Sequence, residues 1–179
     1  MKGYHTITVR WAPFQLNPGM PKEGMDRKEY REKKFGSAAR VEEMDRRMIA
    51  VGKDEGIPFA LDKILRSPNT FDAHRLTWLA GREGVQDAVV DGLFRAFFTE
   101  GRDIGDRSVL TEIGAAVGLD HDAVREFLQS DEGTKEVREE ERRAREIGVD
   151  AVPTFVIGGK FLVSGAQNPE VFLEAFRSL

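Results

Sequence analysis

The C-terminal stretch GVDAVPTFVIGGKFLVSGAQNPEVF limits the possible folds more than any other part of the sequence. Two short apolar runs, residues 154–157 and 161–163, flank Gly158-Gly159, a pair that accepts the positive φ angles of a tight hairpin turn. Asn168 followed by Pro169 is typical of the first residues of a helix. The stretch therefore predicts a β-hairpin followed directly by a C-terminal helix.

A further strand is predicted near the N-terminus, over Thr6–Phe14. Ile7, Val9 and Trp11 recur with the two-residue period of a strand, which would begin almost at Met1. The Pro- and Gly-rich stretch LNPGMPKEG then ends the strand and opens a loop.

Residues 26–148, which separate these two parts, have the pattern of successive helices. Apolar residues recur at helical spacing with charges on the other faces, and Asp106 and Asp120 are predicted N-caps. We expect these helices to form a small bundle that is the most stable part of the protein. Its predicted apolar stripes are Val41, Met44, Met48 and Val51; Ala73, Leu76 and Leu79; and Val85, Val89, Leu93 and Phe97.

Charge and hydropathy exclude several classes of partner. The net charge is −4 and both signs are interspersed, so neither nucleic acid nor a membrane surface is expected as a partner. The chain has no run of about 18 apolar residues, and MKGYHTITVR lacks the apolar stretch of a secretory signal. We therefore expect a cytoplasmic protein.

The chain contains no cysteine. It therefore has no thiolate nucleophile, no thiolate metal site and no internal disulfide. Its histidines, His5, His74 and His121, are scattered without the spacing of metal ligands. The sequence predicts no metal, no cofactor and no catalytic residue.

Four stretches resemble, in this order, the DsbA family of thioredoxin-fold oxidoreductases, in its FrnE-like branch: VRWAPFQLNPGMPKEGMDRKEY, PNTFDAHRL, LFRAFFTEGRDIGDRSVL and GVDAVPTFVIGGKFLVSGAQNPE. The resemblance implies an α/β, thioredoxin-like fold with a large all-helical insertion domain. Residues 1–25 and 149–179 would form the thioredoxin-like domain, and residues 26–148 the insertion. Family members begin with another strand and a helix that carries Cys-x-x-Cys. The sequence begins after both, so we expect the fold to be incomplete at its N-terminus.

The resemblance also implies a binding site. It identifies Val152 and Pro153, with Thr154, as the cis-proline loop, which in the family offers the backbone of the residue before Pro to an extended peptide or to glutathione. The residues alone leave a cis and a trans bond at Pro153 equally open. Other candidate cleft residues are His74, Arg75 and Gln167. A structural, hydrogen-bonded role is the alternative for the first two, and helix capping is the alternative for the third.

Three functions remain as hypotheses. The first is a DsbA/FrnE-like protein disulfide oxidoreductase or isomerase that is redox-inactive in this chain, because disulfide exchange needs a thiolate. The second is a non-catalytic thioredoxin-fold module that binds extended peptides, or a thiol or disulfide protein substrate, at the Pro153 loop. The third is a glutathione-dependent isomerase or transferase. It is weakened because Ala166-Gln167 occupies a place where a charged residue is expected in glutathione-using relatives.

The implied fold predicts a gap in the sheet. The absent strand would lie between Thr6–Phe14 and the hairpin strand Thr154–Ile157, and each unsatisfied buried backbone group costs roughly 1–3 kcal/mol. The N-terminal strand must then slide inward to pair with the hairpin, or a second chain must donate a strand. We favour the second alternative, a homodimer.

Overall fold

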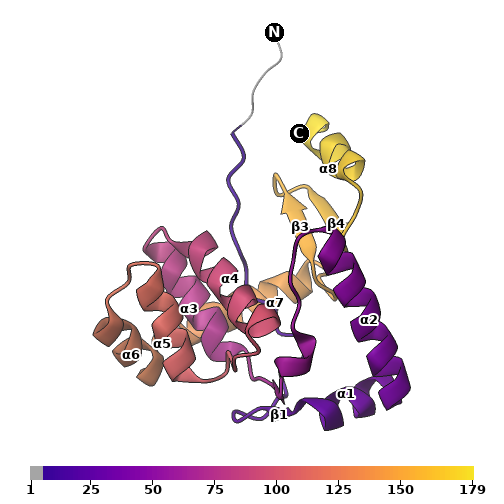
Figure 1. The fold of residues 1–179 in the computed structure, drawn as a ribbon. Helices are drawn as coiled ribbons and strands as arrows, with labels where there is room; N and C mark the ends of the chain where they lie inside the picture. Colours follow the sequence, from indigo (N-terminus) through magenta and orange to yellow (C-terminus); the bar gives the residue numbers. More distant parts are fainter. Residues whose placement is uncertain (1–5) are drawn as a thin grey trace.

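The computed structural model describes residues 6–179 and is mainly helical (Figure 1). Its helices are α1 (Arg27–Phe35), α2 (Ala38–Asp54), η1 (Leu61–Lys63), α3 (Phe71–Arg82), α4 (Gln86–Phe94), the π-helical turn η2 (Arg95–Thr99), α5 (Arg107–Ala116), α6 (His121–Gln129), α7 (Thr134–Glu146) and α8 (Pro169–Arg177). Its strands form two antiparallel pairs, β1 (Met25–Asp26) with β2 (Arg66–Ser67) and β3 (Thr154–Ile157) with β4 (Phe161–Ser164). None of the described helices is long and apolar enough to cross a membrane.

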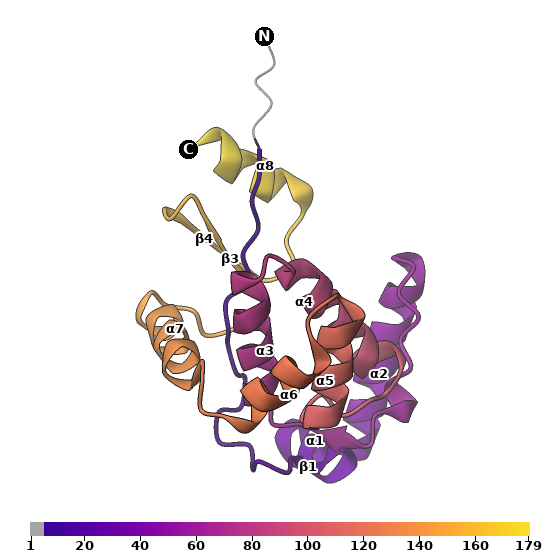
Figure 2. The same cartoon turned by 90° about the vertical axis from the view of Figure 1, so that its left-hand side faces the viewer.

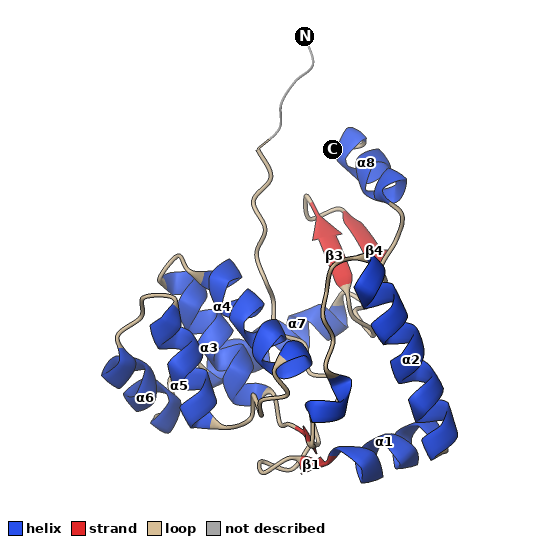
Figure 3. Ribbon diagram, viewed as in Figure 1, coloured by secondary structure: helices blue, strands red, loops and turns tan. Residues whose placement is uncertain are grey.

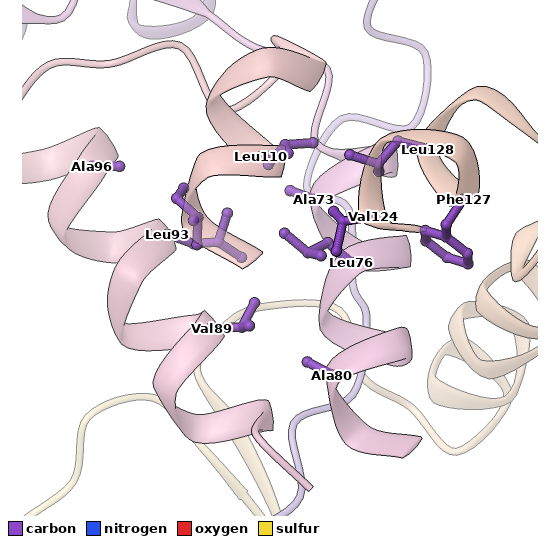
Figure 4. Packing of buried hydrophobic residues seen from close by; sticks show 11 residues of the cluster. Ala73, Leu76, Ala80, Val89, Leu93, Ala96, Leu110, Val124, Phe127 and Leu128 are labelled. Atoms are coloured by element: carbon purple, nitrogen blue, oxygen red, sulfur yellow. The ribbon is translucent and has the colours of Figure 1, made fainter. Parts of the chain in front are cut away.

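The core lies among α3, α4, α5 and α6, which group together on one side of the molecule (Figures 1 and 4). Leu76 from α3 is fully buried there and lies among residues of the three other helices. Asp106 and Asp120 cap α5 and α6 as predicted, each accepting a hydrogen bond from a backbone N–H in the first turn. The other members of the core are Ala73, Ala80, Val89, Leu93, Ala96, Leu110, Ile113, Val124, Phe127 and Leu128.

The predicted stripe on α2 is not part of this core. Met44, Met48 and Val51 are exposed, and the one buried residue of the helix is Gly52. A Cβ atom at Gly52 would lie 2.3 Å from the ring of Phe59, so the missing side chain is what lets that ring approach. The amphipathic pattern therefore predicted the helix correctly and its buried face wrongly.

The predicted strand over Thr6–Phe14 is wrong within the described residues, and Met1 lies outside them. Residues 6–15 form no regular structure and pair with no strand. Trp11 binds α4 instead: Gln86 accepts from its backbone N–H at 2.9 Å and donates to its carbonyl at 3.1 Å, and Asp87 accepts from its indole N–H at 2.6 Å. Side chains of α4 thus make the backbone hydrogen bonds to Trp11 that a neighbouring strand would make in a sheet.

The hairpin forms as predicted, and its turn explains the two glycines. Gly158 and Gly159 have φ angles of 58° and 70°, in the left-handed region that favours glycine. β3, β4 and α8 lie together at one end of the molecule, away from α5 and α6 (Figures 2 and 3).

The division of the chain into two domains, residues 1–25 with 149–179 and residues 26–148, stays a prediction.

A buried arginine joins α3 to the turn between α6 and α7. The Arg75 side chain is 2 % exposed and lies with its guanidinium 4.9 Å from the centre of the Phe127 ring. It also pairs with Asp72 at 2.7 Å, which in turn binds Arg107. The guanidinium donates to four backbone carbonyls, those of Phe127, Leu128, Ser130 and Glu132.

Replacing this guanidinium should destabilise the whole protein. We expect Arg75→Met to lower the free energy of unfolding by about 3 kcal/mol or more, because it leaves several buried carbonyls without a donor. Arg82→Met is the matched control, since Arg82 lies about two helix turns further along α3. It contacts Glu132, and its side chain is largely exposed. Urea denaturation followed by circular dichroism measures both. Equal losses in the two variants would contradict this account of Arg75.

Candidate functional site

The loop that precedes β3 has an unusual backbone. The peptide bond between Val152 and Pro153 is cis, and the Val152 side chain is exposed. Thr154 fixes the loop from one side, because its hydroxyl donates to the carbonyl of Ala151 at 2.7 Å. Gly165 fixes it from the other side, since its N–H donates to the carbonyl of Pro153 at 2.7 Å. The loop is therefore held in shape while its outer surface stays accessible.

The edge of β3 that continues from this loop has no partner strand in residues 6–179. The bond from Gly165 shows that the carbonyl of Pro153 points toward β4. Backbone groups of successive residues point to opposite sides of a strand, so those of Thr154 and Val156 point away from β4. Their N–H and C=O groups are available to an added strand.

Apolar side chains are exposed on the hairpin and on α8. Phe155 packs edge-to-face on Phe172 of α8, with ring centroids 4.9 Å apart, and is still partly exposed. Exposed apolar residues of the hairpin and α8 are Val152, Val156, Leu162, Val171 and Leu173. An extended apolar chain could gain both backbone hydrogen bonds and apolar contacts here.

Gln167 does not line the open edge of β3. Its side-chain N–H donates to the carbonyl of Ser164 at 2.8 Å, at the outer edge of β4. The predicted N-cap at Asn168 is in place, with Pro169 as the first helical residue, but the Asn168 side chain accepts no capping hydrogen bond. Gln167 therefore satisfies the backbone of the turn that leads into α8.

His74 and Arg75 lie on α3, in the helical group. Burial lowers the pKa of His74 to about 4, so its imidazole is neutral at pH 7. Every nitrogen of the Arg75 guanidinium donates a hydrogen bond to its own fold. The structure thus brings Val152, Pro153 and Thr154 together but not with these two residues.

A row of aromatic side chains was not predicted from the sequence. Edge-on and tilted contacts, with centroids 4.9–6.1 Å apart, join the N-terminal segment, α4, η2 and the loop after α2. The aromatic density of LFRAFF was a usable signal, but its spacing suggested only a helix face. The row comprises Trp11, Phe59, Phe94, Phe97 and Phe98.

Neither a metal cluster nor a thiol accompanies the loop and strand edge in the described residues. No cluster of three or more potential metal-ligating side chains occurs in the part of the chain that the structure describes. The sequence has no thiol, so the 179 residues cannot form the mixed disulfide through which disulfide exchange proceeds.

Known proteins resemble the chain over nearly its full length. The Bacillus subtilis protein YwbO is 26% identical over 174 residues, which cover 94% of this chain and 80% of YwbO. A probable DsbA oxidoreductase from Streptomyces coelicolor has a similar structure, with a TM-score of 0.82 and 31% identity over 92% of this chain and 72% of its own.

A more distant structure shares the fold. A 2-hydroxychromene-2-carboxylate isomerase matches with a TM-score of 0.71 and 21% identity, over 96% of this chain and 79% of its own. The family described as the DSBA-like thioredoxin domain matches residues 2–177. The fold is accordingly a DsbA-like thioredoxin fold, mostly helical and with small sheets. The chain belongs to the family of DSBA-like thioredoxin domains.

Proposed function

We propose that the chain is a polypeptide-binding member of the DsbA-like family that recognises extended segments at the Val152–Thr154 loop and does not itself exchange disulfides. The observation that carries the proposal is the exposed Val152–Thr154 loop, continuous with the edge of β3 that no described strand pairs with. Recognition of this kind uses backbone hydrogen bonds for affinity and neighbouring side chains for selectivity. Family resemblance makes proteins that contain thiols or disulfides the natural substrates.

The surroundings of the loop favour apolar, extended ligands. Val152 is 46 % exposed and Val156 is 52 % exposed, and β3 carries no charged side chain. Binding an unfolded segment costs ordering entropy, which sets the expected affinity at roughly micromolar. The cytoplasmic location stays a prediction.

A charge placed on the loop should weaken binding. We expect Val152→Asp to raise the Kd for fluorescein-labelled, reduced and carboxymethylated lactalbumin by about tenfold or more, because the carboxylate must be desolvated against an apolar segment. Leu65→Asp is the control, since Leu65 is even more exposed, at 75 %, and lies elsewhere in the chain. Fluorescence anisotropy measures both. Equal affinity of Val152→Asp and the unaltered protein would contradict the proposed site.

The 179 residues should show no thiol chemistry. Insulin reduction with dithiothreitol should proceed at the rate of the blank, and the melting temperature of the protein should not change with dithiothreitol, because no sulfur atom is present outside methionine. Turbidity and differential scanning fluorimetry are the measurements. Turnover above the blank would refute the first half of this prediction.

The neutral state of His74 should make the protein sensitive to acid. Its pKa is lowered from 6.5 to about 4, so the unfolded chain takes up the proton first as the pH falls. The contribution to stability is complete above about pH 6.5 and is lost toward pH 4, by roughly 2–3 kcal/mol. His74→Gln should flatten this part of the pH profile in urea unfolding, whereas His121→Gln, at an exposed position, should not.

A further inference from the structure

A small pocket lies between η2 and α5, in the helical part of the protein and apart from the Val152–Thr154 loop. Its volume is about 130 Å³, which is enough for a small organic molecule but not for a drug-sized one. Ala96 and Ile113 are the buried apolar side chains in its lining. The pocket opens on a different side of α4 from the Trp11 contacts, because Gly92 in its wall lies about 140° around the helix from Asp87.

The π-helical turn brings charged side chains to this pocket. The backbone N–H of Glu100 donates to the carbonyl of Arg95 at 3.0 Å, which is the five-residue bond of a π turn. In an α-helix, residues five apart would lie on different sides. The next turn of the chain places the N–H of Arg102 at 2.8 Å from the carbonyl of Ala96. The charged residues that line the pocket, including one from α5, are Arg95, Glu100, Arg102 and Glu112.

These four charges alternate in sign from one neighbour to the next. Arg102 donates a hydrogen bond to Glu112. The other two contacts are longer than a hydrogen bond: 3.8 Å from Arg95 Nε to Glu100 Oε1, and 4.0 Å from Arg102 Nη1 to Glu100 Oε2. Within residues 6–179, neither the Glu100 carboxylate nor the Arg95 guanidinium makes a side-chain hydrogen bond. An acceptor and a donor are therefore available side by side at the mouth of an apolar pocket.

We infer that this pocket binds a free α-amino acid with a small aliphatic side chain, through its carboxylate and its ammonium group together. The four side chains sum to zero charge, so a simple anion or cation would be attracted by two of them and repelled by the other two. A zwitterion is attracted by both signs. Its carboxylate accepts from Arg95, its ammonium group donates to Glu100, and its side chain lies against Ala96 and Ile113.

Size and spacing support the same ligand class. The two charged groups of an α-amino acid are attached to one carbon atom, which suits the 3.8 Å between Arg95 and Glu100. The volume of the pocket favours a small aliphatic side chain over an aromatic one. An internal polypeptide segment has neither a free ammonium group nor a free carboxylate at its backbone. The inference therefore goes beyond the proposed binding of polypeptides.

Titration of the ¹⁵N-labelled protein with L-alanine, followed by NMR, tests the site. We expect saturable shifts of backbone amides in residues 92–102 and 112–117, with a Kd of roughly 1 mM, because the ion pairs are exposed and each contributes little. N-acetyl-L-alanine lacks the ammonium group, and L-alaninamide lacks the carboxylate. Each should raise the Kd by about fivefold or more, since one charged hydrogen bond is lost.

Two alanine substitutions test the position of the ligand. Ala116 lines the pocket and is exposed on α5, so Ala116→Leu should fill the pocket without disturbing the fold. We expect it to raise the Kd for L-alanine by about tenfold or more, with a nearly unchanged melting temperature. Ala123→Leu is the matched control, because Ala123 is an exposed alanine of α6 that does not line the pocket. It should leave the Kd unchanged.

A conservative substitution tests the charge. Glu100→Gln keeps the shape of the side chain and removes the negative charge, so it should raise the Kd for L-alanine by about fivefold or more. Three outcomes would overturn the inference: no amide shifts at tens of millimolar L-alanine, equal affinities for L-alanine and L-alaninamide, or unweakened binding of L-alanine by folded Ala116→Leu.

Discussion

The arrangement of the helices depends on the hydrogen bonds and the ion pair of the buried Arg75 guanidinium. Burying a charge costs several kcal/mol unless hydrogen bonds replace the lost water, and here Asp72 and four carbonyls replace it. Those carbonyls belong to the end of α6 and to the turn before α7. One side chain of α3 thus fixes the direction in which the chain leaves the core and enters α7.

The position of the candidate site follows from α7. Its Glu141 is buried and accepts from the backbone N–H of Gln15 at 2.6 Å, and its Arg145 donates to the Gln15 carbonyl at 3.2 Å. The C-terminal part of the same helix therefore holds the N-terminal segment and leads through Gly148 into the Val152–Pro153 loop. The N-terminal segment and the hairpin that carries the proposed site are therefore both connected to α7.

Features that depend on neighbouring residues could be predicted from the sequence. Gly158-Gly159 specified the hairpin, and Asp106 and Asp120 specified two helix starts, because each acts on backbone within a few residues. The Thr6–Phe14 strand failed because alternation shows only that a segment can be a strand, whereas a strand needs a partner. The hydrogen bonds of Arg75 could not be predicted from the sequence either, since its carbonyl acceptors lie more than fifty positions away in the chain.

The buried residues lie in a different part of the protein from the proposed recognition site. Leu76, Leu110, Leu128 and their neighbours bury the core entirely within α3–α6, whereas in β3 and β4 only Ile157 is buried. Because unfolding free energy varies across a structure with the density of buried contacts, the hairpin can gain or lose a strand without disturbing the helices. A strand edge that is proposed to bind polypeptides must be exposed, and its support must stay folded while the edge is empty. The exposed Val156 edge, adjoining a rigidly bonded Pro153 loop on a helical support, meets that condition.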